Sequence, residues 1–489
     1  MKKNKTKVCA IALWLATFVS TSLFGAEADS TGAGSASAAA GTKLTLTVQD
    51  AVSLAEKNSR TLKSAQIDVA VKERTGKYGW NVLLPTVNVT GTMSRTSEYS
   101  PSTKAYANIF SALSQGAISM PTDYADEEAH WSTIGGVAVS WNFNLALIQA
   151  IHASKVAYES GKISLKQSQR EVNTQIRKLF YGLLLQQEAL KIQQTTLENS
   201  RQRMTQSQTN FRNGSVPELS FLQAQVSYQN MVPEVENSKS ALRQNLDMFA
   251  FLLGVPVGTE IELVGAIEPT YIDVDADELL AKYGGNNLDI QSLRTNIEAM
   301  KIKLSITSLS TWTPSLAVSY GYQPVYIGSD GAWHFYKGIG KDEDWYNSGS
   351  LSLTLAWNLT NMLPWSSNMQ GYKDDQATLA KLELSLETLL ENQKVEVRKA
   401  VDTLNQARAQ IDAMGRNVDV AQRAYDMIMR QYRNGMAELL DVRDTENQLN
   451  QAKLGQLQQK NNYISALMDL EQALNVGLTR PPVSDAKTE

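Results

Sequence analysis

The sequence predicts a mainly α-helical chain that also carries four membrane-type β-strands and is built as two copies of one unit. Three observations predict this fold class: two long stretches with a seven-residue apolar period, four short segments of alternating apolar and small polar residues, and a shift of 221 positions that matches one half of the chain to the other. The 489 residues include 46 Lys and Arg and 50 Asp and Glu, for a formal net charge of −4. This balance argues against a general nucleic-acid-binding protein, which should be basic.

The N-terminus has the features of a secretory signal, expected over residues 1–28. Four lysines among the first seven residues precede an apolar stretch over 8–23, and residues 29–43 are rich in Gly, Ala and Ser, as in a flexible linker. The one cysteine of the chain, Cys9, lies inside the expected signal. The mature protein is therefore expected to have no disulfide although it is exported. Residues 479–489 are expected to form a C-terminal tail.

The internal repeat is clearest where each long apolar pattern stops. Residues 211–214 read Phe-Arg-Asn-Gly and residues 432–435 read Tyr-Arg-Asn-Gly. Upstream of both, an apolar residue recurs every seven positions: Ile176, Leu183, Leu190, Leu197, Met204 and Phe211 in the first copy, and Val397, Leu404, Ile411, Val418, Tyr425 and Tyr432 in the second. A seven-residue period is typical of helices that coil around a partner. Gly just after the last periodic residue is a common helix stop.

The repeat predicts two units, at 44–255 and 286–478, with a segment at 256–285 between them. Each unit should hold a long helix, at about 145–213 and 366–434, followed by a return helix, at about 216–253 and 437–475. About 70 residues at 1.5 Å each make a rod about 100 Å long.

Each unit should also hold two strands, at about 85–95 and 134–144 in the first and at about 314–323 and 350–360 in the second. Their length near ten residues, apolar on one face and uncharged polar on the other, is typical of outer-membrane strands. The tryptophans after the signal all lie in or beside these segments and none lies in the long helical stretches: Trp80, Trp131, Trp141, Trp312, Trp333, Trp345, Trp357 and Trp365. Tryptophan favours the interface between membrane and water.

Four strands are too few to close a barrel. Backbone groups in lipid must all be paired, and bacterial barrels start at about eight strands. The chain is therefore expected to associate with copies of itself and to share a barrel with them.

This layout resembles the TolC-like outer-membrane factor family over nearly all of the mature chain. The resemblance implies a homotrimer, with four strands per protomer in a shared 12-strand β-barrel, a long periplasmic α-helical tunnel, and a small mixed equatorial domain to which 256–285 contributes. It also implies an exit channel in outer-membrane lipid that works with a periplasmic adaptor (membrane fusion protein) and an inner-membrane transporter of RND, ABC or MFS type.

In that family the tunnel closes around the second turn, where a Tyr and a Gly precede two acidic residues. Tyr432, Gly435, Asp441 and Asp444 match this pattern. Asp441 and Asp444 are three residues apart and so share one face of a helix. In a trimer each would form a ring of carboxylates that favours cations; the alternative is a solvated helix face.

Two departures from the family archetype affect the gate. Ala437 stands where the archetype has Arg, and Ser220 stands where it has Asp. The salt-bridge and hydrogen-bond lock that the family archetype uses at its gate therefore does not transfer to this chain. The turns also correspond to the tips that receive the adaptor, and the candidate contact residues are Arg212, Gly214, Val216, Arg433, Gly435 and Met436.

No enzyme, cofactor or metal site is expected. His130, His152 and His334 are scattered and lack metal-ligand spacing. The expected function is passive export of cargo chosen by partners, with drug efflux and protein secretion left open. The alternative is a trimeric surface adhesin or a solid coiled-coil stalk. A solid stalk should fill both heptad columns of its long helices with large residues. In the first copy the second column, three positions after the first, instead reads Leu179, Gln186, Gln193, Ser200 and Ser207, which disfavours a stalk.

Overall fold

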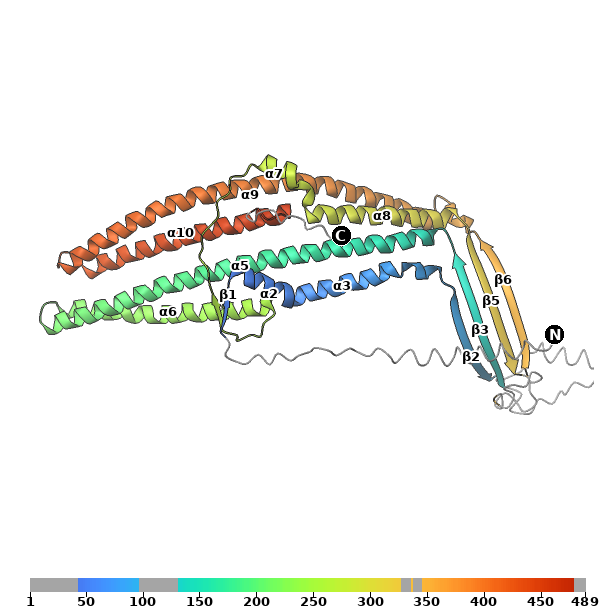
Figure 1. The fold of residues 1–489 in the computed structure, drawn as a ribbon, viewed down its shortest axis with the longest axis horizontal. Coiled ribbons are helices and arrows are strands. Elements are labelled where there is room, and N and C mark those ends of the chain that lie inside the picture. Colours follow the sequence, from blue (N-terminus) through green and yellow to red (C-terminus); the bar gives the residue numbers. More distant parts are fainter. Residues whose placement is uncertain (1–42, 96–130, 327–335, 337–344, 479–489) are drawn as a thin grey trace, which may run out of the picture.

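The computed structural model describes residues 43–95, 131–326, 336 and 345–478. The expected signal peptide, most of the linker and the C-terminal tail lie outside this range. Figure 1 shows an elongated molecule, in which long helical hairpins make up most of the length and a sheet stands at one end. This arrangement confirms the mainly α fold class with a separate β region.

Two hairpins of equal dimensions form the helical body. The long helices α5 (Ala146–Arg212) and α9 (Ser367–Arg433) each have 67 residues, and the return helices α6 (Glu218–Leu253) and α10 (Leu439–Leu474) each have 36. Every one of these boundaries is related to its counterpart by 221 positions, which confirms the internal repeat. At 1.5 Å per residue, each long helix extends about 100 Å.

Two further helices complete the body on the side of the sheet. α3 (Arg60–Lys77) packs against α5, and α8 (Leu288–Trp312) packs against α5 and α9. The short 3-10 helices η1 (Gly79–Leu83) and η6 (Leu359–Met362) lie where helix meets sheet.

A small mixed α/β region surrounds the middle of the helical body. Its elements are β1 (Leu44–Leu46), which pairs in parallel with β4 (Ile261–Leu263), together with α2 (Val48–Asn58), α7 (Ala276–Tyr283) and η3 (Gly284–Asn286). These elements cover two buried cores, one around Phe180 and Phe249 and one around Tyr463. The nearly buried carboxylate of Glu471 accepts from Arg177 at 2.8 Å and ties α10 to α5 at this level.

The sheet has the order β2-β3-β5-β6 and is antiparallel throughout. Its strands are β2 (Thr86–Arg95), β3 (Trp131–Phe143), β5 (Ser315–Tyr326) and β6 (Trp345–Ala356). Within the described chain, β2 and β6 are each paired on one side only.

The register places the apolar side chains of all four strands on one face. One cross-strand row runs through Val87, Val139, Tyr320 and Leu351. This face is open: Val87 is 62% exposed and Leu351 is 74% exposed. On the other face hydroxyl groups pair across strands, as between Ser319 and Ser352 at 2.6 Å.

The last strand differs from the expected range 350–360. It begins at Trp345 and ends at Ala356. It stops there because the Trp357 indole N–H donates to the Thr311 carbonyl at 3.4 Å, and the Asn358 side chain accepts from the Thr360 N–H at 3.1 Å to begin η6. The apolar alternation through Trp357 and Leu359 therefore continues into a turn that strand periodicity does not reveal.

Among the described helices, none combines the length and apolar character needed to cross a bilayer.

Candidate functional site at the helix tips

The two hairpins end at the same end of the molecule, farthest from the sheet (Figure 1). All nine residues singled out from the sequence lie in or next to the two turns there: Arg212, Gly214, Val216, Tyr432, Arg433, Gly435, Met436, Asp441 and Asp444. The fold thus brings together two sets of residues that are separated by about 220 positions in the sequence.

The two turns have the same hydrogen-bond pattern. The Ser215 N–H donates to the Asn210 carbonyl at 2.8 Å, and the equivalent Met436 N–H donates to the Gln431 carbonyl, also at 2.8 Å. Both Gly214 and Gly435 have φ of 73°. A Cβ at either position would meet no atom within 4 Å, so the backbone conformation, not lack of space, requires glycine.

Asp441 has a structural role in addition to its charge. Its carboxylate accepts from the Glu438 N–H at 3.1 Å and completes a capping box with Glu438 at the start of α10. The side chain is nevertheless exposed.

Asp444 lies one turn further along the same face of α10. It is also exposed, and its carboxylate is 3.7 Å from the Arg443 guanidinium. Val442, between the two acids, is fully buried. The two carboxylates therefore lie away from the hairpin core, where neighbouring chains or solvent can reach them.

The remaining candidates differ in exposure. Tyr432 is half-buried, as its heptad position predicts, and so is Val216. The side chains of Arg212 and Arg433 are exposed, and Met436 is 77% exposed.

A buried charged cluster, which sequence reasoning missed, joins the two hairpins near the tips. Arg203 on α5 donates to Glu446 on α10 at 2.5 Å, and these side chains are only 10% and 5% exposed. Asn199 on α5 donates to the same carboxylate at 3.1 Å, and the Tyr425 hydroxyl on α9 donates to it at 3.4 Å. Burial, reinforced by the Glu446 carboxylate, raises the pKa of Tyr425.

The sequence does not single out this cluster. Glu446 shares a seven-residue column of α10 with Leu467 and Leu474, but Lys453 and Lys460 stand between them in the same column. A column that also holds two lysines does not mark Glu446 as a buried acid. The partner could not be named because Arg203 is 243 residues away in the sequence.

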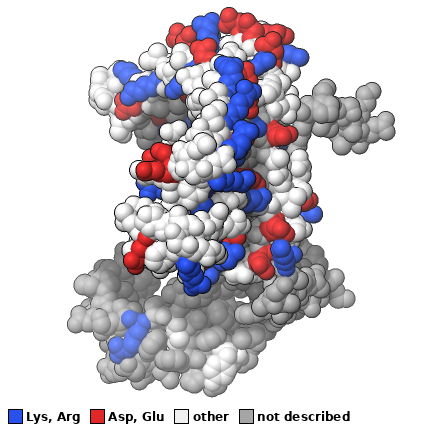
Figure 2. Space-filling view, turned by 90° about the vertical axis from the view of Figure 1, so that its left-hand side faces the viewer, with Lys and Arg blue, Asp and Glu red and all other residues white. Residues whose placement is uncertain are grey.

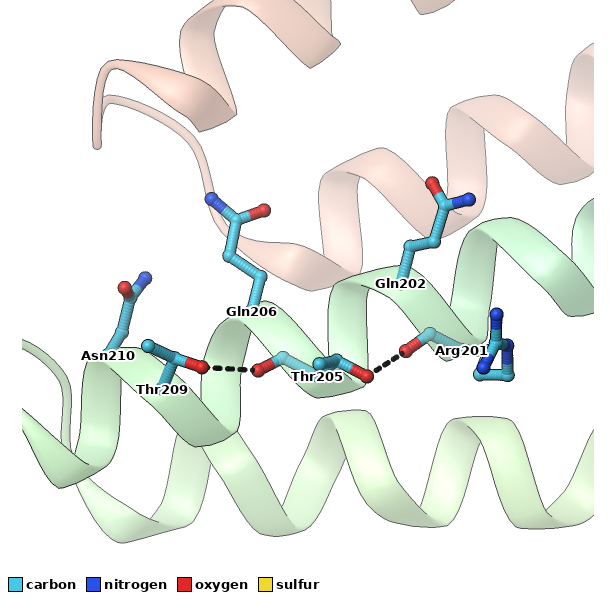
Figure 3. Close-up of a pocket in the computed structure, with 6 residues that line it drawn as sticks. All are labelled: Arg201, Gln202, Thr205, Gln206, Thr209 and Asn210. Carbon is cyan, nitrogen blue, oxygen red and sulfur yellow. Dashed lines mark hydrogen bonds between the residues drawn. The ribbon is translucent and has the colours of Figure 1, made fainter.

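A shallow polar groove lies on α5 beside this cluster. It is lined by Arg201, Gln202, Thr205, Gln206, Thr209 and Asn210. Figure 3 shows Gln202 and Gln206 pointing toward the second hairpin, while the Thr205 and Thr209 hydroxyls donate to carbonyls of α5 itself. Viewed from the tip end, Lys and Arg form a band down the middle of the face, while acidic residues gather at its top and lie in separate spots on both sides of the band (Figure 2).

Within the described residues, no group of three or more His, Cys, Asp or Glu side chains is arranged to hold a metal ion.

Comparison with known proteins places these features in a family. The family model described as outer membrane efflux protein matches residues 51–255 and 279–476. The chain therefore belongs to the outer membrane efflux protein family, as the resemblance to TolC-like factors implied. No curated protein matches the chain in sequence.

Solved outer-membrane proteins share the fold at low sequence identity. CmeC of Campylobacter jejuni matches with a TM-score of 0.70 at 15% identity, over 87% of this chain and 85% of CmeC. VceC of Vibrio cholerae matches with a TM-score of 0.66 at 14% identity, over 88% and 96%. The open state of MtrE from Neisseria gonorrhoeae matches with a TM-score of 0.61 at 15% identity, over 88% and 89%. CmeC and MtrE are described as outer membrane channels, and VceC is described as an outer membrane protein.

Proposed function

We propose that this chain forms, as a homotrimer, the outer-membrane exit channel of a tripartite efflux pump or type I secretion system. The observation that carries the proposal is the sheet: its apolar face is exposed on β2, β5 and β6, and within the described chain it has two unpaired edges, while ~100 Å helical hairpins continue from one end of it. A sheet in lipid must close. Three copies joined edge to edge would supply twelve strands.

In this proposal the helices form the periplasmic tunnel and the tips form its gate. Asp441 and Asp444 of three chains would make two acidic rings at the constriction, with Tyr432 close by. The support is that both carboxylates are exposed on one face of α10 while Val442 is buried on the other. Rings of carboxylates select cations.

The buried cluster takes the place of the archetypal lock. Arg203 lies 11 residues before Gly214, and Glu446 lies 11 residues after Gly435, so the link joins the hairpins at equal depth from their tips. Moving the second hairpin away from the first would break this ion pair and the hydrogen bond that Asn199 donates to the same carboxylate. We propose that this link keeps the resting channel narrow and yields when an adaptor binds.

The adaptor would dock on the turns. The exposed candidates there are Arg212, Arg433 and Met436, held in place by the two glycine turns. An inner-membrane transporter of RND, ABC or MFS type would supply energy and choose the cargo.

The oligomeric state in the outer membrane tests this function. The mature chain, purified from the outer membrane, is expected to run as a trimer in native mass spectrometry. It is also expected to migrate as a heat-sensitive oligomer on gels, because a shared barrel resists detergent. A monomer extracted from the periplasm in folded form would contradict the proposal.

A further inference from the structure

We infer that a small cavity near the helix tips, where α5, α6 and α10 meet, is a binding site for a chloride ion. Each helix contributes two of the residues that line this cavity: Ser200 and Arg203 of α5, Ala224 and Ser227 of α6, and Leu439 and Arg443 of α10. We call it the three-helix cavity. The inference goes beyond the channel proposed above and does not depend on it.

The size of the three-helix cavity limits what it can hold. Each helix contributes two residues that are three or four positions apart, and residues at this spacing share one face of a helix. The three faces leave a space of about 10 Å³ between them. A space of this size has room for about one water molecule or one monatomic ion, and it excludes phosphate, sulfate and organic molecules.

Arg203 brings an unused hydrogen-bond donor to this cavity. Its side chain is only 10% exposed, and its Nη2 donates to the Glu446 carboxylate. Its Nη1 is buried and has no hydrogen-bond partner in the described chain. A guanidinium group carries only donors, and a buried donor that stays unpaired destabilises the fold. The missing partner of Nη1 must therefore be an acceptor.

The other polar groups around the three-helix cavity can donate as well. Ser200 is buried and Ser227 is half-buried, and neither side chain makes a hydrogen bond within the described chain. Both hydroxyl groups can therefore donate to an ion in the cavity. Arg443 lines the cavity and its side chain is 54% exposed. An ion can enter from solvent past this side chain.

Two guanidinium groups beside one small space favour an anion over a water molecule. Both stay positively charged at physiological pH, and like charges repel each other most strongly where water is scarce. The nearby carboxylates do not line the cavity: Glu446 pairs with Arg203, and Asp444 lies 3.7 Å from Arg443. A chloride ion would accept from donors on all three helices and would offset the repulsion, whereas a water molecule carries no charge.

The internal repeat shows that a helical hairpin of this kind forms without these charges. The 221-residue shift relates each lining residue to a counterpart in the other copy of the unit. Three of the four polar lining positions have apolar counterparts and only Ser227 has a polar one: Ala421, Ala424 and Leu222, against Gln448. The two arginines therefore point to a role beyond the packing of the hairpins.

Bromide tests the site directly, because it replaces chloride and its anomalous scattering locates it in a crystal. Wild-type crystals grown in sodium bromide should show an anomalous peak in the three-helix cavity, in contact with Arg203 Nη1. Arg443→Gln keeps hydrogen-bond donors but removes one charge, and it should lose the peak. The matched control, Arg423→Gln at an exposed position of α9, should keep it. A wild-type cavity that holds only water in bromide would overturn the inference.

Thermal unfolding tests the same site in solution. A ligand that binds only the folded protein stabilises it, and the effect grows with ligand concentration. Because salts also act on stability in a non-specific way, each variant is measured in sodium chloride and in sodium gluconate at equal ionic strength. The difference in midpoint, chloride minus gluconate, should be larger for wild type and Arg423→Gln than for Arg443→Gln and Ser227→Ala. The same difference in all four proteins would overturn the site, and neither outcome depends on whether the protein conducts.

Discussion

At the residue scale, the charged cluster between the hairpins is the feature with the clearest energetic consequence. Removing one partner of a buried ion pair destabilises a protein strongly, because the other charge stays buried without compensation. Glu446 is 4% exposed as a whole residue and holds polar groups from both α5 and α9. It therefore links three helices at one point.

Glu446→Ala should weaken the link between hairpins by about 3 to 5 kcal/mol, because Arg203 stays buried without its partner. The expected readouts are a lower thermal midpoint of the trimer and more frequent wide openings in single-channel recordings. Arg203→Met/Glu446→Leu should recover most of the wild-type behaviour, since apolar replacement of a whole buried pair is often neutral.

Glu198→Gln is the matched control for charge. In the wild-type chain the Glu198 carboxylate accepts hydrogen bonds from Arg201 on the same helix, and both side chains are exposed. These hydrogen bonds lower the pKa of Glu198 to about 2. The substitution should leave the midpoint and the openings unchanged. Equal effects of the exposed and the buried substitutions would show that the cluster has no special role.

The turn glycines give a second prediction at this scale. Gly435→Ala forces a Cβ into a backbone with φ of 73° and should cost about 1–2 kcal/mol. Loss of adaptor binding together with a lower thermal midpoint would be the expected pair of results.

Gly371→Ala is its control, at a helical position in α9 where a Cβ meets nothing within 4 Å. Alanine favours the helix there by about 1 kcal/mol, so the midpoint should stay or rise. A Gly435→Ala trimer as stable as this control would contradict the turn assignment.

At the element scale, the sequence predicted the repeated helices and the strands well, because their signals are local. Seven-residue columns and a glycine stop define α5 and α9, and alternation defines the strands. The last strand was placed too late because Trp357 continues the alternation while its indole bonds the Thr311 carbonyl in a turn. Periodicity reports side-chain pattern, not the end of backbone pairing.

The site was only partly predictable for a related reason. The turns and the two acids of α10 follow from local spacing, but the capping role of Asp441 depends on backbone geometry and the Arg203–Glu446 pair depends on tertiary contact. Nothing near Arg203 in the sequence distinguishes it from the exposed Arg201 two residues earlier.

The open face of the sheet yields the element-scale prediction. Leu353 of β6 is 71% exposed on the apolar face, and Thr354 next to it points to the opposite face. Leu353→Arg should place a charge in lipid at a cost of about 2–4 kcal/mol near the bilayer centre and lower the amount of assembled protein in the outer membrane.

Thr354→Arg, which should face the interior of the barrel, is expected to assemble normally. Immunoblots of outer-membrane fractions measure both variants. Equal assembly of the two would mean that the apolar face does not meet lipid.

At the scale of the whole molecule, the chain looks incomplete by itself in three ways. Its sheet has two unpaired edges, its apolar sheet face is open, and its row of tip helices, in the order α9, α10, α5 and α6, has two free ends. Association of copies around one axis would pair the sheet edges and cover the free helices at the same time. Lipid would cover the apolar face of the sheet. Because of the internal repeat, each chain can supply two similar helical hairpins to such a ring.

Single-channel current through the purified protein in a planar bilayer tests this account most directly. Wild type is compared with Asp441→Asn/Asp444→Asn, which removes the charges but leaves an oxygen at position 441 to accept from the Glu438 N–H. The account predicts a steady, small, cation-preferring conductance in wild type and a clear loss of cation preference in the variant. An unchanged selectivity would move the gate away from these two residues. The absence of any conductance from folded trimers, including those with Glu446→Ala to open the tips, would contradict the channel and favour a solid stalk.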